Sequence, residues 1–310
     1  MMRKSLLWLS EQPKVFRFVR GNSLARKFAS RFVAGEDVAT AIAAVRPLNA
    51  KGITASLDLL GESVTKESEA AAARDEYLRM LDRIAESKVD ANVSVKLTQM
   101  GFDIGEEICF ANMAKILDQA KSYGTFVRLD MESSAYTQRT LDFFTNRLGA
   151  TWGAHTGVVI QSCLRRSEAD IANLVRLKVR VRLCKGAYLE PSTVAFPDKA
   201  DVDRTYVTLM ERLMAEGNYP GIATHDEKII AHARDYARAS HIGPERFEFQ
   251  MLYGVRRDLQ ERLRADGYNV RVYIPFGTQW YPYLMRRLAE RPANVAFILG
   301  SVMRETLSGH

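Results

Sequence analysis

The chain has 310 residues, of which 47% are hydrophobic, 26% charged and 9% aromatic, a balance typical of a soluble globular protein. No apolar run approaches the ~18 residues that a membrane-spanning helix needs. The three cysteines, Cys109, Cys163 and Cys184, follow no disulfide or zinc-ligand spacing. Integral membrane proteins, disordered chains and disulfide-stabilised scaffolds are therefore excluded.

The formal net charge of +7 is concentrated near the N-terminus. The first 35 residues hold eight Lys or Arg and one Glu, which leaves 36 basic and 36 acidic residues in the rest of the chain. Leu24, Phe28 and Phe32 recur four residues apart and predict an amphipathic helix with a basic side. Such an arm can pack on the main domain, dock on an anionic membrane surface or bind nucleic acid. From the residues alone we expect the first.

From Lys51 onward, short β-prone apolar runs alternate with longer helical patterns, which predicts βαβ units around a parallel sheet. Eight runs can be counted: Ile53 to Leu60, Asn92 to Leu97, Phe126 to Met131, Gly157 to Gln161, Val179 to Cys184, Gly221 to Thr224, Phe247 to Leu252 and Val270 to Pro275. Helical stretches between them include Lys66 to Ser87, Glu106 to Ser122, Asp201 to Glu216 and Glu227 to Ala239.

Eight strands and eight helices in about 250 residues predict an α/β protein of the closed (β/α)₈ barrel type. No linker rich in Pro, Gly or Ser divides this stretch. We therefore expect two parts, a basic helical extension over residues 1–45 and a single barrel domain over residues 46–310.

A (β/α)₈ barrel carries its active site at the C-terminal ends of its strands, so polar residues that end or follow the runs are candidates. This test selects Asp58, Glu62, Lys96, Thr98, Asp130, Glu132, Gln161, Arg182, Lys185, Thr224, His225, Asp226, Gln250, Tyr253 and Tyr273. So many polar groups on one rim would be costly to bury without a polar ligand. The rim is therefore predicted to bind one.

Several of these candidates also allow a structural interpretation. Lys96 could point outward past a helix, or into the barrel mouth, where it would bind an anion or form a Schiff base. Asp130 could cap a helix or orient a lysine, and His225 could cap the next helix together with Thr224 and Asp226. No metal site is expected, because the histidines lack the H-E-x-x-H spacing.

The fifth run, VRVRLCKGAYLEP, is the most specific segment. Arg182 within a barrel strand is hard to bury without an anionic or hydrogen-bonding partner. The turn at Gly186 and Ala187 permits a close approach of the backbone to a ligand. With the amide of Gln161 one strand away, these groups could hold an electron-rich, flat ring system. Since neither G-x-G-x-x-G nor a phosphate-loop motif occurs, barrel loops would have to hold any nucleotide cofactor.

The segment YPYLMRRLAERPAN follows the eighth run. As a helix it places Arg286, Arg287 and Glu290 on one side. Both guanidinium groups could converge on one carboxylate, with a bidentate geometry that lysine does not offer. The alternative is a solvated basic face.

These segments, taken in order, resemble the proline dehydrogenase family, the flavoenzymes of proline catabolism. The resemblance runs from about Phe32 to Leu299 and is carried by RFVAGE, SLDLLGE, VSVKLT, RLDMESS, VVIQS, VRLCKGAY, ATHD, QMLYG, VYIPFG and YPYLMRRLAERPAN. It implies a distorted (β/α)₈ barrel whose final helix crosses the mouth. It also implies FAD as cofactor and oxidation of L-proline to 1-pyrroline-5-carboxylate.

The resemblance also implies a role for individual residues. Arg286, Arg287 and Lys96 contact the proline carboxylate, and Tyr273 and Leu252 line the substrate pocket. Asp130 supports Lys96, and Arg182 lies near the flavin N5. Glu62 resembles a gate residue that pairs with Arg286 when substrate is absent. The residues that resemble the FAD-contacting set are the backbone of Met131, and Gln161, Lys185, Gly186, Ala187, Tyr188, Thr224, His225 and Glu290.

The partners implied by the resemblance are L-proline, membrane quinone as electron acceptor and a separate pyrroline-5-carboxylate dehydrogenase downstream. Quinone would give the basic arm a purpose in peripheral membrane docking, so we expect a cytoplasmic protein that can sit on the inner face of the membrane. Nucleic acid is not an expected partner. Two rival classes remain: a Schiff-base lyase that uses Lys96 or Lys185, and a barrel that binds nucleic acid through its arm.

Overall fold

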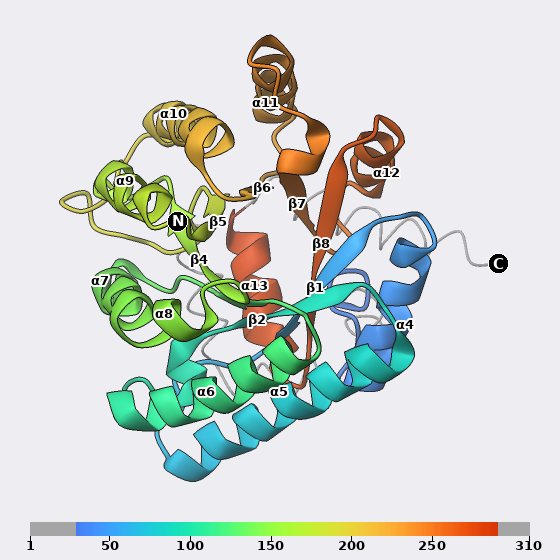
Figure 1. Cartoon of the computed structure of the whole chain (residues 1–310), viewed down its shortest axis with the longest axis vertical. Coiled ribbons are helices and arrows are strands. Elements are labelled where there is room, and N and C mark those ends of the chain that lie inside the picture. The colour runs from blue at the N-terminus through green and yellow to red at the C-terminus, as the bar shows by residue number, and fades with distance from the viewer. Residues whose placement is uncertain (1–28, 291–310) are drawn as a thin grey trace.

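The computed structural model describes residues 29–290 of the chain, and side chains as far as residue 285. Eight parallel strands run through this part: β1 Thr54–Leu59, β2 Ala91–Val95, β3 Val127–Leu129, β4 Thr156–Gln161, β5 Arg180–Cys184, β6 Gly221–Ala223, β7 Glu248–Leu252 and β8 Asn269–Phe276. The strands pair in sequence order, and β8 pairs back on β1, which closes the barrel (Figure 1). The eight predicted strands and the closed barrel are confirmed.

Helices connect the strands and surround the barrel (Figure 1). Those in the described range are α4 Val38–Asn49, α5 Glu67–Ser87, α6 Glu106–Ser122, α7 Ser134–Phe143, α8 Gly149–Trp152, α9 Ser167–Arg176, α10 Lys199–Glu216, α11 Glu227–Ala239, α12 Arg257–Ala265 and α13 Trp280–Glu290. Three short turns, η1 Leu97–Met100, η2 Phe144–Leu148 and η3 Pro244–Arg246, complete the set. The predicted bounds of α6 and α11 are confirmed, and α10 begins two residues before its prediction.

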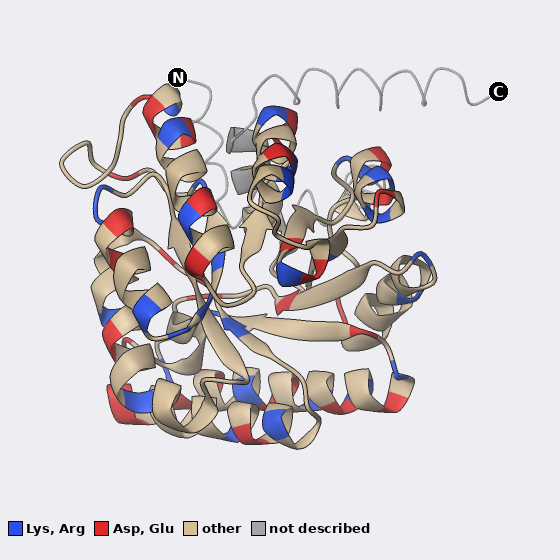
Figure 2. Ribbon diagram, turned by 45° about the horizontal axis from the view of Figure 1, so that its top comes forward, with Lys and Arg blue, Asp and Glu red and all other residues tan. Residues whose placement is uncertain are grey.

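Alternation along the strands separates an apolar outside from a polar inside. On β2, Val93 and Val95 belong to the main hydrophobic cluster, which they share with residues of the surrounding helices. Ser94, between them, accepts a hydrogen bond from Arg182 on β5, three strands away, so this side of β2 faces the barrel interior. The core therefore lies between strands and helices, whereas the interior is polar. Figure 2 shows charged residues both on the helices and on the strands.

Helix α4 shows why the chain enters the barrel where it does. Asp37 accepts a hydrogen bond from the backbone of Thr40 at 2.8 Å, and Thr40 closes a capping box that starts the helix. The buried face of α4 includes Val38 and Val45 and packs in the main cluster with the strands. The expected division between residues 45 and 46 thus falls within α4, and the barrel domain takes in this whole helix.

A second, smaller hydrophobic cluster lies at the C-terminal ends of β1 and β8. It consists of Ala29, Val33, Leu60, Trp280, Tyr281, Tyr283, Leu284 and Met285, with Phe32 packed against it. Backbone bonds from Ala34 to Pro275 and from Gly277 to Gly35 tie the entering chain to the end of β8. The start of α13 is therefore fixed at this end of the barrel, and Figure 1 draws α13 over the middle of the ring.

Most of the basic arm lies outside the described residues. Of the three positions that predict an amphipathic helix, Leu24 and Phe28 fall outside, and Phe32 lies in a turn. In the described part of the chain, no helix has both the length and the apolar character needed to cross a membrane.

Candidate active site

The residues selected from the sequence gather at the C-terminal end of the barrel. Lys96, Asp130 and Met131 directly follow β2 and β3. Gln161 and Leu252 are the last residues of β4 and β7, Arg182 lies in the middle of β5, and Tyr273 lies in the second half of β8. The loops that leave this rim carry Glu62, Lys185, Gly186, Ala187, Tyr188, Thr224 and His225. The side chains of Arg286, Arg287 and Glu290 lie outside the described residues, although the backbone of α13 includes their positions.

Lys96 points into the barrel and not past a helix. Its Nζ donates to Asp58 Oδ1 at 2.9 Å, and both residues are buried, with 9% and 1% of their surfaces exposed. Burial alone would lower the pKa of Lys96, but the carboxylates of Asp58 and Asp130 raise it well above its ordinary value. Lys96 is therefore held as a buried cation near the mouth.

Asp130 uses both carboxylate oxygens. Arg182 Nη1 donates to Oδ1 at 2.7 Å, and the hydroxyl of Tyr273 donates to Oδ2 at 2.7 Å. Burial and the charges of Asp130 and Asp58 hold the pKa of Tyr273 well above its ordinary value, so the hydroxyl keeps its proton and donates. The hydrogen-bonding partner of Lys96 is thus Asp58, and Asp130 acts on Lys96 through its charge alone.

Arg182 is held on all sides of its guanidinium group. Besides the bond to Asp130, Nε donates to Gln250 Oε1 and Nη2 donates to Ser94 Oγ at 3.2 Å. The guanidinium carbon lies 5.2 Å from the centre of the Tyr273 ring, close enough for a cation–π contact. These contacts fix the orientation of Arg182 before any ligand arrives.

A second ion pair lies deeper in the barrel. Gln250 donates from its amide to Glu248, and Arg271 Nε donates to the same carboxylate at 2.8 Å. Glu248 is 3% exposed, so this pair is shielded from water. Together with the rim contacts it forms a continuous chain of hydrogen bonds, which runs from Arg271 through Glu248 and Gln250 to Arg182.

The groups after β4, β5 and β6 form the opposite side of the rim. Gln161 Nε2 donates to the backbone of Glu132 at 2.9 Å. Lys185 Nζ bridges Asp203 at 2.6 Å and Asp226 at 2.9 Å. Asp226 caps α11 by accepting a hydrogen bond from the backbone N–H of Lys228. Of Thr224, His225 and Asp226, it is therefore Asp226 whose side chain caps this helix. Lys185 therefore ties the β5 loop to the cap of α11.

Thr224 and His225 support this arrangement. The Thr224 hydroxyl accepts from the backbone of Asp226 at 3.1 Å. His225 Nε2 accepts from the backbone N–H of Leu252 at 2.9 Å, so in this geometry Nε2 carries no proton. Histidine thereby links the ends of β6 and β7.

The turn after β5 requires glycine at position 186. Its φ of +110° lies in the left-handed region, and a Cβ at this position would stand 2.4 Å from Cys163 Sγ and 3.3 Å from Gln161 Oε1. The backbone of this turn thus packs directly against the residues that follow β4.

Several residues of the network were missed in the sequence. Asp58 and Gln250 were selected by position without a partner, whereas Ser94, Glu248 and Arg271 were not selected. Their signal is a spacing of two: Ser94 precedes Lys96, Glu248 precedes Gln250 and Arg271 precedes Tyr273, each on one strand. Polar residues two apart in a barrel strand face the same interior.

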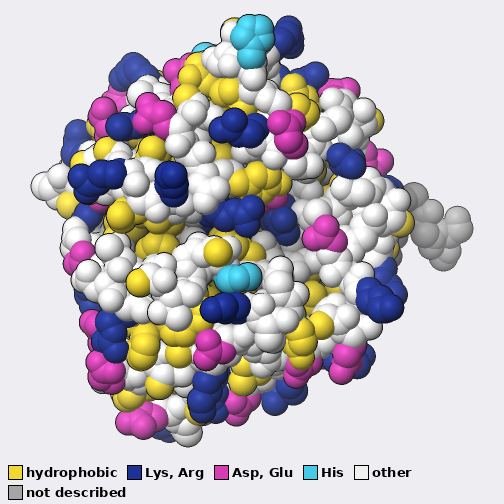
Figure 3. Space-filling view, in the orientation of Figure 1, with side chains coloured by type: hydrophobic (Ala, Val, Ile, Leu, Met, Phe, Trp, Pro, Cys, Tyr) yellow, Lys and Arg dark blue, Asp and Glu magenta, His cyan; other side chains and the backbone are white. Residues whose placement is uncertain are grey.

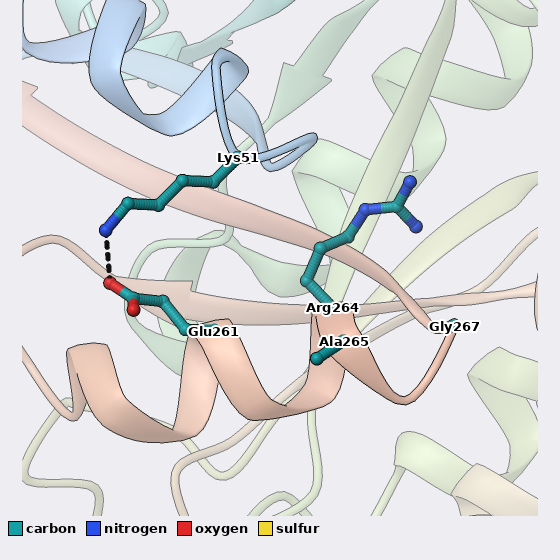
Figure 4. A pocket seen from close by; sticks show the side chains of 5 residues that line it. All are labelled: Lys51, Glu261, Arg264, Ala265 and Gly267. Atoms are coloured by element: carbon teal, nitrogen blue, oxygen red, sulfur yellow. Dashed lines mark hydrogen bonds and ion pairs between the residues drawn. The ribbon is translucent and has the colours of Figure 1, made fainter.

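A surface hollow of about 530 Å³ lies away from this rim. It is lined by Lys51, Glu261, Arg264, Ala265 and Gly267 (Figure 4). Lys51 precedes β1 and Gly267 precedes β8, so the hollow lies at the N-terminal ends of the strands. Its Lys51–Glu261 pair is half exposed. The strand ends that carry the chemistry of a (β/α)₈ barrel are on the opposite side, so this hollow is not part of the candidate active site.

Among the side chains of residues 29–285, no three His, Cys, Asp or Glu gather as metal ligands would. The space-filling view shows Lys and Arg side chains near the middle of the face it presents (Figure 3). In the barrel interior, Lys96, Arg182 and Arg271 each pair with a carboxylate. Arg128 donates instead to the backbone carbonyls of Val158 and Arg180. Such a site can bind an anionic group and orient it against a second ligand.

The chain is similar to known proteins over most of its length. The chain is 42% identical to proline dehydrogenase of Deinococcus radiodurans over 305 residues, which cover 97% of this chain and 98% of that protein. It is 39% identical to proline dehydrogenase 1 of Bacillus subtilis over 305 residues, which cover 98% of this chain and 100% of that protein.

A solved structure of proline utilization A from Bdellovibrio bacteriovorus, inactivated by N-propargylglycine, matches with a TM-score of 0.81 and 26% identity. The match covers 89% of this chain and 34% of that one, so this chain spans about a third of the larger protein. A model of the proline dehydrogenase family matches residues 41–299. Because that match includes all eight strands and the relatives are similar over nearly the whole length, the chain belongs to the proline dehydrogenase family.

Proposed function

We propose that this protein oxidises L-proline to 1-pyrroline-5-carboxylate, with FAD as the acceptor of the hydride. The observation that carries the proposal is the barrel mouth itself, where Lys96 and Arg182 are buried cations held by Asp58 and Asp130. Family membership supplies the substrate class, and this geometry supplies the means to bind it.

The residues on one side of the rim fit FAD. The set of donors combines the Gln161 amide, the Lys185 ammonium and the Arg182 guanidinium, a mixture suited to an electron-rich ring and to phosphate groups. Gly186 lets the backbone of the turn pack against Cys163 and Gln161, which keeps the Lys185 and Gln161 donors on one side of the rim. We propose that Gln161, Lys185, Gly186, Ala187, Tyr188, Thr224, His225, Glu290 and the backbone of Met131 hold the cofactor.

FAD, when bound, supplies a two-electron acceptor, and the protein supplies orientation, charge and exclusion of water. Proline is a zwitterion, so its carboxylate needs fixed cations, which we assign to Lys96, Arg286 and Arg287. Hydride can leave C5 only while the ring nitrogen is unprotonated, so the nitrogen must give up its proton before this step. Tyr273 and Leu252 would line the pocket and keep the ring against the cofactor.

Asp130 and Arg182 take the positions closest to the chemistry in this proposal. Arg182 is fixed by Asp130, Gln250 and Ser94, so it would present its charge to the cofactor without reorganisation. Glu62, half-buried in the loop after β1, would pair with Arg286 in the absence of substrate and release it when proline binds.

We further propose that electrons pass to membrane quinone. The basic residues of the first 35 positions would then attract the protein to an anionic membrane surface on the cytoplasmic side, at roughly 1 kcal/mol for each basic residue near the lipid. The product would be oxidised by a separate dehydrogenase, and nucleic acid has no part in this proposal.

The visible spectrum of the purified protein, followed anaerobically as L-proline is added, tests the proposal. We expect a yellow protein whose flavin absorption bleaches with proline. A yellow protein that does not respond to proline would contradict the substrate but retain the cofactor. A protein that stays colourless after incubation with FAD would overturn the proposal. The Schiff-base alternative requires a neutral lysine, whereas the pKa of Lys96 is raised by its neighbours.

A further inference from the structure

The loop that carries Glu62 is fixed at both of its ends. It spans residues 60–66 between β1 and α5. At its start, Leu60 donates its N–H to Phe276 at 2.8 Å and packs with Trp280 and Leu284 of α13. Its other end turns at Ser63, whose φ of +57° is in the left-handed region that a residue with a side chain rarely adopts. This conformation needs a partner to hold it.

That partner is Thr98, which lies in η1, two residues after Lys96. The Thr98 hydroxyl accepts from Ser63 N at 3.0 Å, and the Thr98 carbonyl accepts from Val64 N at 3.3 Å. Thr98 is fully buried. A single buried residue therefore binds two consecutive amides of the loop, immediately after Glu62.

Glu132 orients Thr98. The Thr98 hydroxyl donates to Glu132 Oε2 at 2.7 Å, and the Thr98 N–H donates to Oε1 at 3.2 Å. Because the hydroxyl proton points to this carboxylate, a lone pair of the oxygen is left for Ser63. Glu132 is 6% exposed, and its backbone carbonyl accepts from Gln161. The contact thus extends from the loop to the cofactor side of the rim.

We propose that Thr98, oriented by Glu132, is a positioning residue that sets the height of Glu62 over the barrel mouth and so controls how tightly proline is retained. Thr98 itself touches neither substrate nor cofactor. Leu60 fixes the loop against α13, and Thr98 fixes it against η1, which begins directly after Lys96. Glu62 lies between these two anchors. The role in retaining proline rests on the proposed function.

The test compares Thr98→Val with Thr98→Ser. Valine keeps the shape but removes the hydroxyl, whereas serine keeps the hydroxyl. We expect Thr98→Val to raise the KM for L-proline about tenfold, while kcat and the flavin spectrum change by less than about twofold, because only the loop anchor is lost. Thr98→Ser should restore the KM. Hydrogen exchange in the peptide holding Ser63 and Val64 should be faster in Thr98→Val by about fivefold or more.

Thr137→Val is the matched control. Thr137 lies in α7, is 1% exposed, and its hydroxyl has no hydrogen-bond partner within the described part of the chain. Its loss should leave KM, kcat and loop exchange unchanged. If Thr98→Val does not fold, Glu132→Gln takes its place, since it removes one of the two carboxylate oxygens that orient Thr98.

Three outcomes would overturn the inference. They are an unchanged KM with unchanged loop exchange in Thr98→Val, an equal fall in kcat, FAD content and proline affinity, and a failure of Thr98→Ser to restore the KM. Wild-type flavin that L-proline does not reduce would instead contradict the proposed function. The exchange measurement separates the two cases, because it needs no substrate.

Discussion

Lys96 shows how burial and charge oppose each other at a single residue. Its ammonium is almost fully removed from water, which disfavours the charged form. The Asp58 carboxylate 2.9 Å away and the charge of Asp130 more than compensate, so the pKa lies above its ordinary value. A buried cation held in this way is available to bind a carboxylate.

Replacing Asp58 by Asn should make this cation sensitive to pH. Burial, which lowers the pKa of Lys96, then acts against the charge of Asp130 alone. As the pH rises, Lys96 loses its proton earlier than in the wild type. We expect the KM for L-proline to rise by about tenfold or more between about pH 7 and pH 10 in the variant, as one charge-assisted contact is lost.

The measurement is the KM as a function of pH, with Ser56→Ala as control. Ser56 faces the same interior on β1, but its hydroxyl bonds to Ser94 and not to Lys96. Its variant should follow the wild-type profile. A KM for Asp58→Asn that is raised by the same factor at every pH would mean that Asp58 does not maintain the charge of Lys96.

At the scale of elements, the sequence predicted the strands well because each is a short apolar run that ends in polar residues. It also placed Lys96, Asp130 and Arg182 on one rim, since parallel strands in a barrel end on the same side. It did not predict which carboxylate pairs with Lys96. That choice depends on the register between β1 and β2, which pairs Asp58 with Ser94 and so brings Asp58 beside Lys96, and no local pattern encodes this register.

The side chains of two neighbouring strands also fit each other in a way that no single segment reveals. Gly221 on β6 pairs in register with Glu248 on β7, and a Cβ at position 221 would stand 2.5 Å from Gln250 Nε2. The missing side chain thus makes room for the amide that holds Arg182. Glycine is required at position 221 because the Gln250 side chain lies so close to its backbone.

Gly221→Ala should therefore act on Arg182. The added methyl group displaces the Gln250 amide, which removes a bond from the Arg182 guanidinium, and we expect a loss of about 1–3 kcal/mol in stability. FAD content or the rate of flavin reduction should fall as well. Thermal unfolding and the absorption of bound flavin measure the two effects.

Gly105→Ala is a suitable control for this variant. A Cβ at Gly105 would lie at an ordinary contact distance of 3.5 Å from Ile108, which is not one of the residues that hold Arg182. This substitution should cost at most about 1 kcal/mol at the N-cap of α6 and leave the flavin unaffected. Normal flavin content and reduction in Gly221→Ala would show that Arg182 does not depend on Gln250.

At the scale of the whole molecule, the barrel interior carries a network of charges where related folds place layers of aliphatic side chains. Three carboxylates face four cations there: Asp58, Asp130 and Glu248, and Lys96, Arg128, Arg182 and Arg271. Three of these cations form ion pairs, Lys96 with Asp58, Arg182 with Asp130 and Arg271 with Glu248. Replacing one member of such a pair leaves the other buried and unpaired, which costs more than the intact pair contributes. The stability of the barrel and the chemistry of the site therefore depend on the same charged residues.

The pKa of Glu248 determines how the stability of the barrel changes with pH. Burial alone would raise its pKa, but the charge and hydrogen bond of Arg271, with the Gln250 amide, lower it below the ordinary value. A carboxyl group with a lowered pKa in the folded state stabilises the protein above its unfolded-state pKa. That contribution is lost as the pH falls through the folded-state value.

Glu248→Gln should accordingly destabilise the protein by about 3–5 kcal/mol at neutral pH, because Arg271 loses its buried partner. The difference from the wild type should stay constant above about pH 5 and shrink below about pH 4, as Glu248 takes up a proton in the wild type. Denaturant unfolding between about pH 4 and pH 5 measures this difference.

Glu261→Gln is the control, because it removes the partner of Lys51 in the surface hollow (Figure 4). This substitution should cost no more than about 1 kcal/mol, because the pair is half exposed. If the loss of stability in Glu248→Gln were equally small, or did not vary with pH, the stability of the barrel would not depend on the ion pair of Glu248 and Arg271.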